Sequence, residues 1–228
     1  MSPGLTINVL RDSCKPYIHI HMTNLATRTS ADLITEFAGG ESSDVSMMIG
    51  IGLIKDSDGV FFEYLGEEQQ PRALMLPSGK PLTRMANVRV AGVDIAEDVG
   101  EFNSTKLNLI LETTAGSRVM LTSGLTTIWS QCVLTSLMGM LNKSLIEEVF
   151  QLDSWNGTAK MRPTFAAVRI KGQKISDQEM YELFADARTN RDNDLKEQLA
   201  RNCVTQLQAA LGVVNVDVTV EATKTEEF

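Results

Sequence analysis

One block of the sequence, residues 86–171, has the pattern that most constrains how this chain can fold. It holds three strand-like segments, one strongly apolar helix-like segment and two further strand-like segments. The first strand, residues 87–96, is interrupted by Gly92, and a glycine inside a strand often marks a bulge or a sharp bend. The second and third, TKLNLILET and RVMLTS, are separated by the turn residues 114–117 and predict a hairpin.

The remaining part of this block predicts a buried helix and a second strand pair. A helix of about 18 residues is expected from near Thr126, because its apolar residues recur at helical spacing over a wide face. Trp129 lies on that face and is expected in the core. EVFQLDSW and TFAAVRIKG then form the closing strands, joined by the loop 154–163.

The flanking segments predict further strands and a second helical region. Residues 45–65 read as a hairpin around Asp-Ser-Asp-Gly, and ALML as one short strand. Upstream, LTINVL and YIHIHM read as strands and ADLITEF as a short helix. Ser176 and Glu179 form a capping box that opens a helix ending at Gly212, broken or fully solvated at 189–194. VVNVDVTVE then alternates like a strand, and residues 222–228 form an acidic tail.

Together these segments predict an α+β protein, mainly antiparallel, in four parts. Residues 1–85 form a β-rich N-terminal extension, 86–175 a five-stranded barrel with its buried helix, 176–221 a helix plus a strand, and 222–228 the tail. No transmembrane run or signal peptide is evident. Three widely spaced cysteines indicate a reducing compartment, and we expect a cytoplasmic protein of a bacterium or a phage-infected host.

Charge and motifs favour binding over catalysis. The net charge is −8, yet residues 101–175 carry 8 Lys/Arg against 5 Asp/Glu and hold both tryptophans. No G-x-S-x-G elbow or phosphate-binding loop occurs, so we predict no enzyme and no cofactor. His19 and His21 share a strand face, but a zinc site takes three or four ligands, so no metal is predicted.

The element order of residues 86–171, with the hairpin GEFNSTKLNLILETTAGSRVMLTS leading into the buried helix, resembles the OB-fold of bacterial and phage single-stranded DNA-binding proteins. That resemblance implies a DNA replication or repair protein that binds single-stranded DNA, or alternatively RNA, in a barrel groove. Bases would stack on Trp155 and cations would neutralise phosphates. The implied binding residues are Trp155, Lys160, Arg162, Arg118, Lys106 and Arg89.

The last residues, Glu226, Glu227 and Phe228, resemble the acidic, aromatic-ended tail with which such proteins recruit replication or recombination partners. A homo-oligomer is also expected. Two alternatives stay open. The chain can instead be a structural or assembly protein, such as a virion or scaffold component, or a protein-binding module without nucleic-acid activity. Equally, Trp155 can fold back onto the barrel, leaving the loop cations solvated.

Overall fold

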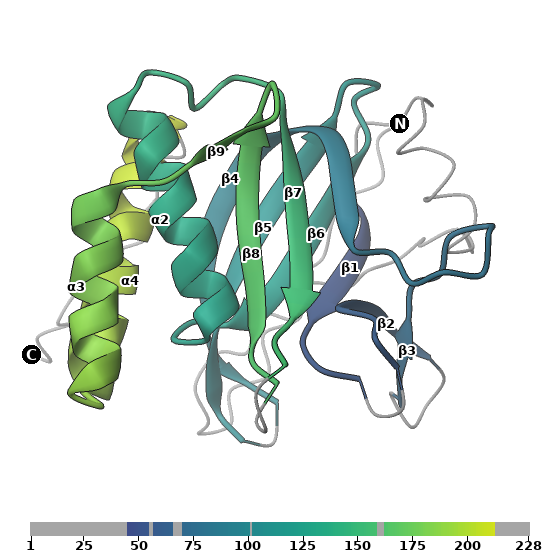
Figure 1. Ribbon diagram of the computed structural model, residues 1–228, viewed down its shortest axis with the longest axis horizontal. Coiled ribbons are helices and arrows are strands. Elements are labelled where there is room, and N and C mark those ends of the chain that lie inside the picture. The colour runs from purple at the N-terminus through teal and green to yellow at the C-terminus, as the bar shows by residue number, and fades with distance from the viewer. Residues whose placement is uncertain (1–44, 55–56, 66–69, 101, 159–161, 213–228) are drawn as a thin grey trace, which may run out of the picture.

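The computed structural model describes residues 45–54, 57–65, 70–100, 102–158 and 162–212 (Figure 1). These residues form nine strands and three helices. The strands are β1 (Val45–Ile51), β2 (Phe61–Leu65), β3 (Gln70–Ala73), β4 (Arg84–Val99), β5 (Ser104–Thr113), β6 (Arg118–Gly124), β7 (Phe150–Asn156), β8 (Thr164–Ile170) and β9 (Gln173–Ile175), and the helices are α2 (Ile128–Asn142), α3 (Gln178–Thr189) and α4 (Asn193–Ala210).

All nine strands belong to one sheet, in the order β3-β2-β1-β6-β5-β4-β7-β8-β9. Every neighbouring pair is antiparallel except β1 and β6, which run parallel. The protein is therefore a mixed α+β fold with a large, mostly antiparallel sheet. The predicted hairpins, over residues 45–65 and 105–123, are confirmed.

The predicted closed barrel is not confirmed, because the sheet is open. Closing the five-strand block would require its outermost strands, β6 and β8, to pair with each other. Instead, β1 pairs along β6 and β9 pairs with the end of β8. The sheet is nevertheless strongly bent, as β4 shows (Figure 1). One register shift in β4 lies between Val90 and Gly92, where the glycine predicted a bulge.

The strands divide their side chains between a core face and a solvent face. On β5, Leu107, Leu109 and Leu111 are buried, while the residues between them are half-buried. The same alternation makes Phe61 fully buried on β2 and leaves Tyr64 exposed. One prediction in this region was wrong: the short strand is β3, Gln70–Ala73, and it ends where ALML begins.

Helix α2 packs against β8 and forms the centre of the core. It begins two residues after Thr126, because the Thr127 side chain caps the helix by accepting a hydrogen bond from the Ser130 amide. As predicted, Trp129 is in the core, only 1% exposed. Its indole Nε1 donates to Ser154 Oγ on β7 at 3.0 Å, which ties the helix to the sheet.

The second helical region is broken, in line with one of the two predicted outcomes. Helix α3 ends at Thr189, and Asp192 caps the new helix α4. The capping box at Ser176 was wrong by one residue. Asp177 is the N-cap of α3, and its carboxylate accepts a hydrogen bond from the Met180 amide at 2.8 Å. A carboxylate at this position also suits the positive end of the helix dipole.

The three helices lie together beside the sheet (Figure 1). Helix α4 covers part of β4, where the buried Gln208 side chain donates to the Val93 carbonyl at 3.0 Å. Among the described residues, none of the helices combines the length and the apolar character that a membrane span requires. The predicted elements before residue 45, the valine strand and the tail lie outside the described residues.

Candidate functional site

The predicted binding residue Trp155 lies at the end of β7 and is 44% exposed. Strand alternation puts Ser154 toward the core and Trp155 on the other side. Its ring stacks on Phe165 of the paired strand β8, with centroids 6.0 Å apart and planes 20° apart. The Trp155 ring is therefore partly exposed on the side of β7 opposite Ser154. Packing against Phe165 restricts the orientation of the ring.

Of the two predicted cations in the β7–β8 loop, Arg162 lies among the described residues. Arg162 has a positive φ of 40° and forms an ion pair with Asp58, in the loop before β2, at 2.9 Å. That pair is exposed and joins two loops that are distant in sequence. Lys160 lies outside the described residues.

Arg89 and Arg118 lie on the solvent face of the sheet, on either side of β5. Both guanidinium groups contact the Glu112 carboxylate, at 2.9 Å and 2.7 Å respectively. The hydrogen bond from Arg118 is the main reason why the pKa of Glu112 is lowered, and the charge of Arg89 adds to it. Lys106 is six residues from Glu112 along the same strand, or about 20 Å. The structure therefore does not gather the five described residues of the predicted six into one site.

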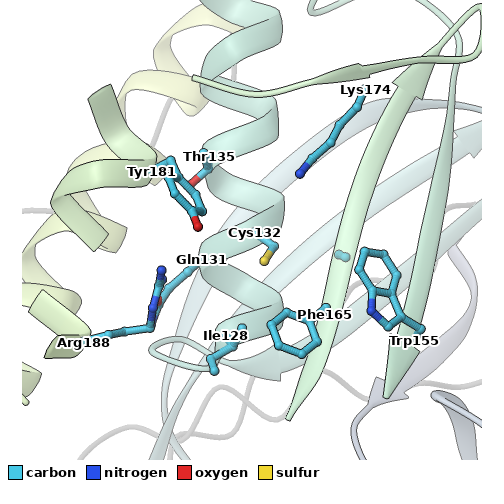
Figure 2. Close-up of a pocket in the computed structure, with 10 residues that line it drawn as sticks. Ile128, Gln131, Cys132, Thr135, Trp155, Phe165, Lys174, Tyr181 and Arg188 are labelled. Atoms are coloured by element: carbon cyan, nitrogen blue, oxygen red, sulfur yellow. The ribbon is translucent and has the colours of Figure 1, made fainter. Parts of the chain in front are cut away.

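A groove beside β8 gathers a different set of residues (Figure 2). It is bounded by α2, α3, β8 and β9, and its volume is about 210 Å³. Its aromatic side chains come from three elements: Trp155 from β7, Phe165 from β8 and Tyr181 from α3. The remaining lining residues are Ile128, Gln131, Cys132, Thr135, Ala166, Lys174 and Arg188.

The charges of this groove are all positive. Lys174 on β9 is exposed and points toward α2 (Figure 2). Arg188 on α3 donates to Gln131 Oε1 at 2.6 Å, and its guanidinium lies 5.9 Å from the Tyr181 ring centroid. Within the described part of the chain, neither cation forms an ion pair with a carboxylate.

This arrangement contrasts with the arginines that cluster at Glu112 and Asp153 on the sheet. Arg84 and Arg169 both contact Asp153, at 2.7 Å and 3.0 Å. Burial alone would raise the pKa of Asp153, but the hydrogen bonds from Arg84, Gln151 and Arg169 lower it overall. The four arginines that contact Glu112 and Asp153 are thus already neutralised by these carboxylates. The groove cations can meet an anionic ligand without first breaking such a pair.

The groove offers stacking surfaces and hydrogen-bond donors. Cys132, half-buried in the wall, is its only nucleophilic thiol, and both histidines of the chain lie outside the described residues. In the described ranges, no group of three or more His, Cys, Asp or Glu side chains could hold a metal ion.

Sequence reasoning identified Trp155 but missed Phe165, Lys174, Tyr181 and Arg188. Tyr181 and Arg188 are seven residues apart and so share one face of α3. That spacing was a usable signal. Nothing local, however, indicated that this face meets the edge of β8.

Comparison with known proteins adds no assignment, because no family model, no curated protein and no solved structure matches the chain.

Proposed function

We propose that this chain is a non-catalytic binding protein for single-stranded nucleic acid, with DNA as the expected ligand. One observation carries the proposal. In a chain of net charge −8, the groove beside β8 combines three aromatic rings with two cations, and none of the described residues in its wall is a carboxylate. Aromatic platforms flanked by cations are the usual means by which proteins hold single strands without reading their sequence.

Stacking is the first contribution to this binding. The exposed face of Trp155 is available to a base, and the stacking contact with Phe165 keeps the Trp155 ring oriented. Stacking one base on an aromatic side chain contributes about 1–3 kcal/mol. A duplex hides its base faces in its own stack, so this contribution favours single strands.

Phosphate contacts are the second contribution. Lys174 supplies an ammonium group on a flexible stem, and Arg188 supplies a guanidinium that Gln131 and Tyr181 already orient. Charge-assisted hydrogen bonds to phosphate are stronger than neutral ones. Because each contact releases condensed counterions, the affinity should fall steeply with salt.

The strand pairing supports relating this protein to the OB-fold. The five strands of the block pair in the order β6-β5-β4-β7-β8. We interpret this as an OB-type barrel opened between β6 and β8, with β1 added along β6. In that interpretation, Lys160 and Arg162 of the β7–β8 loop contact the nucleic-acid strand next to the groove.

The proposal includes a cytoplasmic location and recruitment of replication or recombination proteins by the tail residues Glu226, Glu227 and Phe228. Deleting residues 222–228 should therefore abolish binding to such a partner while oligonucleotide binding persists. Loss of both functions together would contradict a separate recruiting tail.

The test is a fluorescence-anisotropy titration of a labelled oligo-dT, with oligo-U and a duplex as comparison ligands. Binding to oligo-dT is expected at about 50 mM salt, with a negative slope of log affinity against log salt. Lys174→Gln should reduce the magnitude of that slope by about 0.7, the value for one phosphate contact on a single strand. Lys171→Gln is the matched control, because Lys171 is exposed in the turn between β8 and β9 and does not line the groove.

Trp155→Ala should weaken binding by about 5- to 150-fold, the equivalent of one stacked base. Absence of oligonucleotide binding at low salt would refute the proposed function. Binding that Trp155→Ala and Lys174→Gln both leave unchanged would refute the groove as its site.

A further inference from the structure

The tip of the β4–β5 hairpin presents an apolar surface to solvent. Phe102 is 90% exposed, and Val99 beside it is 38% exposed. The turn that carries them is hydrogen-bonded: the Asn103 amide donates to the Gly100 carbonyl at 3.2 Å, and Ser104 Oγ donates to the Val99 carbonyl at 3.1 Å. Phe102 therefore projects into solvent from a segment that these two hydrogen bonds stabilise.

The same tip is acidic. Asp98 is exposed at this tip, and the sequence adds a second carboxylate, Glu101, next to Phe102. Glu97 is half-exposed, but its charge is compensated by an ion pair with Arg201. Phosphates would be repelled by this charge, so the tip is poorly suited to a second nucleic-acid contact. Its best partner is a surface that is both apolar and basic.

The groove beside β8 is such a surface. Its volume of about 210 Å³ and its largely apolar wall, with Ile128, Phe165 and Ala166, suit a phenyl ring. For comparison, an apolar cavity of roughly 150 Å³ accommodates benzene. Lys174 and Arg188 at the groove complement the carboxylates of the tip.

We propose that a second copy of this chain inserts Phe102 of its β4–β5 hairpin into this groove. Tip and groove are different surfaces, so the contact is head-to-tail and can extend into chains or rings. The inference depends on the shape and charge of the two surfaces and not on the proposed nucleic-acid activity. If that activity also holds, oligonucleotide and neighbouring subunit compete for one groove, and self-association belongs to the nucleic-acid-free protein.

Sedimentation velocity of the full chain at low salt tests the inference. The wild type should show a mass that rises with concentration. Phe102→Ser and Lys174→Glu should each weaken association by roughly 30-fold, the loss typical of a hot-spot residue. Leu53→Ser and Lys171→Glu are matched controls, since both residues are exposed and lie outside tip and groove, and both variants should associate as the wild type does.

Mixing the two weakened variants gives a sharper result. Phe102→Ser keeps an intact groove and Lys174→Glu keeps an intact tip, so the mixture should form a one-to-one heterodimer that cannot grow. A wild type that stays monomeric would overturn the inference. So would a Phe102→Ser variant that self-associates normally, or a mixture that remains monomeric while the wild type associates.

Alkylation of Cys132 reports occupancy of the groove directly. Cys14→Ser removes one of the other two thiols, and Cys203 is buried, with its pKa raised to about 12 mainly by that burial. Protection of Cys132 should increase with protein concentration and be lost in Phe102→Ser. Protection that is independent of concentration would mean an occupant from the same copy and would overturn the inference. Heterodimer formation without oligonucleotide binding would leave the self-association standing and refute only the proposed function.

Discussion

Replacing Ser154 by alanine should destabilise the protein through a residue on another element, Trp129. Trp129 is 1% exposed and Ser154 is 2% exposed. The indole N–H of Trp129 donates its hydrogen bond to Ser154 Oγ at 3.0 Å. Ser154→Ala leaves the buried N–H without its partner, which costs about 1–3 kcal/mol. For a chain of this length, about 2 kcal/mol corresponds to a fall of roughly 4–8 °C in Tm.

Urea unfolding followed by circular dichroism measures this cost, and a double-mutant cycle isolates its origin. In a Trp129→Phe background there is no indole N–H to leave unpaired, so adding Ser154→Ala should cost much less. Ser136→Ala is the control: Ser136 is also buried, but its hydroxyl donates to the Cys132 carbonyl of the same helix. Its loss leaves no donor unpaired. Equal costs of Ser154→Ala in the two backgrounds would refute the reasoning.

Two further predictions concern stability. Gly139→Ala should destabilise by about 1–3 kcal/mol despite alanine's higher helix propensity, because the new Cβ would lie 2.5 Å from the Ser176 backbone carbon; a raised Tm would contradict this. The Glu112 pKa is lowered in the folded state, so its stabilisation is present above the unfolded value of about 4.3 and is lost as pH falls through the folded value. The difference in urea midpoint between wild type and Glu112→Gln should therefore narrow in acid, and a constant difference would count against the ion pairs.

The sequence predicted best where local pattern decides the structure. The β5–β6 hairpin, the bulge at Gly92 and the burial of Trp129 all follow from spacing within a few residues. The open sheet does not follow from local spacing, because it depends on β1 pairing with β6 across about 70 residues of chain. Helix propensity likewise could not decide between Ser176 and Asp177 as the N-cap.

The candidate site was predictable only in part, for a similar reason. Trp155 was identified because the sequence placed it in the loop 154–163. The structure places it in β7 instead and leaves it 44% exposed. The OB-fold resemblance placed Arg89 and Arg118 in the site, but it does not reveal that both contact Glu112. Tyr181 belongs to another element, and its place in the groove is set by how α3 packs beside α2.

The most direct test of the central claim is tryptophan fluorescence during an oligo-dT titration. The chain has two tryptophans, and Trp129 is buried, so a base stacking in the groove should quench only Trp155. The account predicts saturable quenching in the wild type and none in Trp155→Phe. That variant should still bind in the anisotropy assay, because phenylalanine also stacks. Quenching that persists in Trp155→Phe, or saturating binding with no quenching in the wild type, would contradict the claim that single strands bind at this groove.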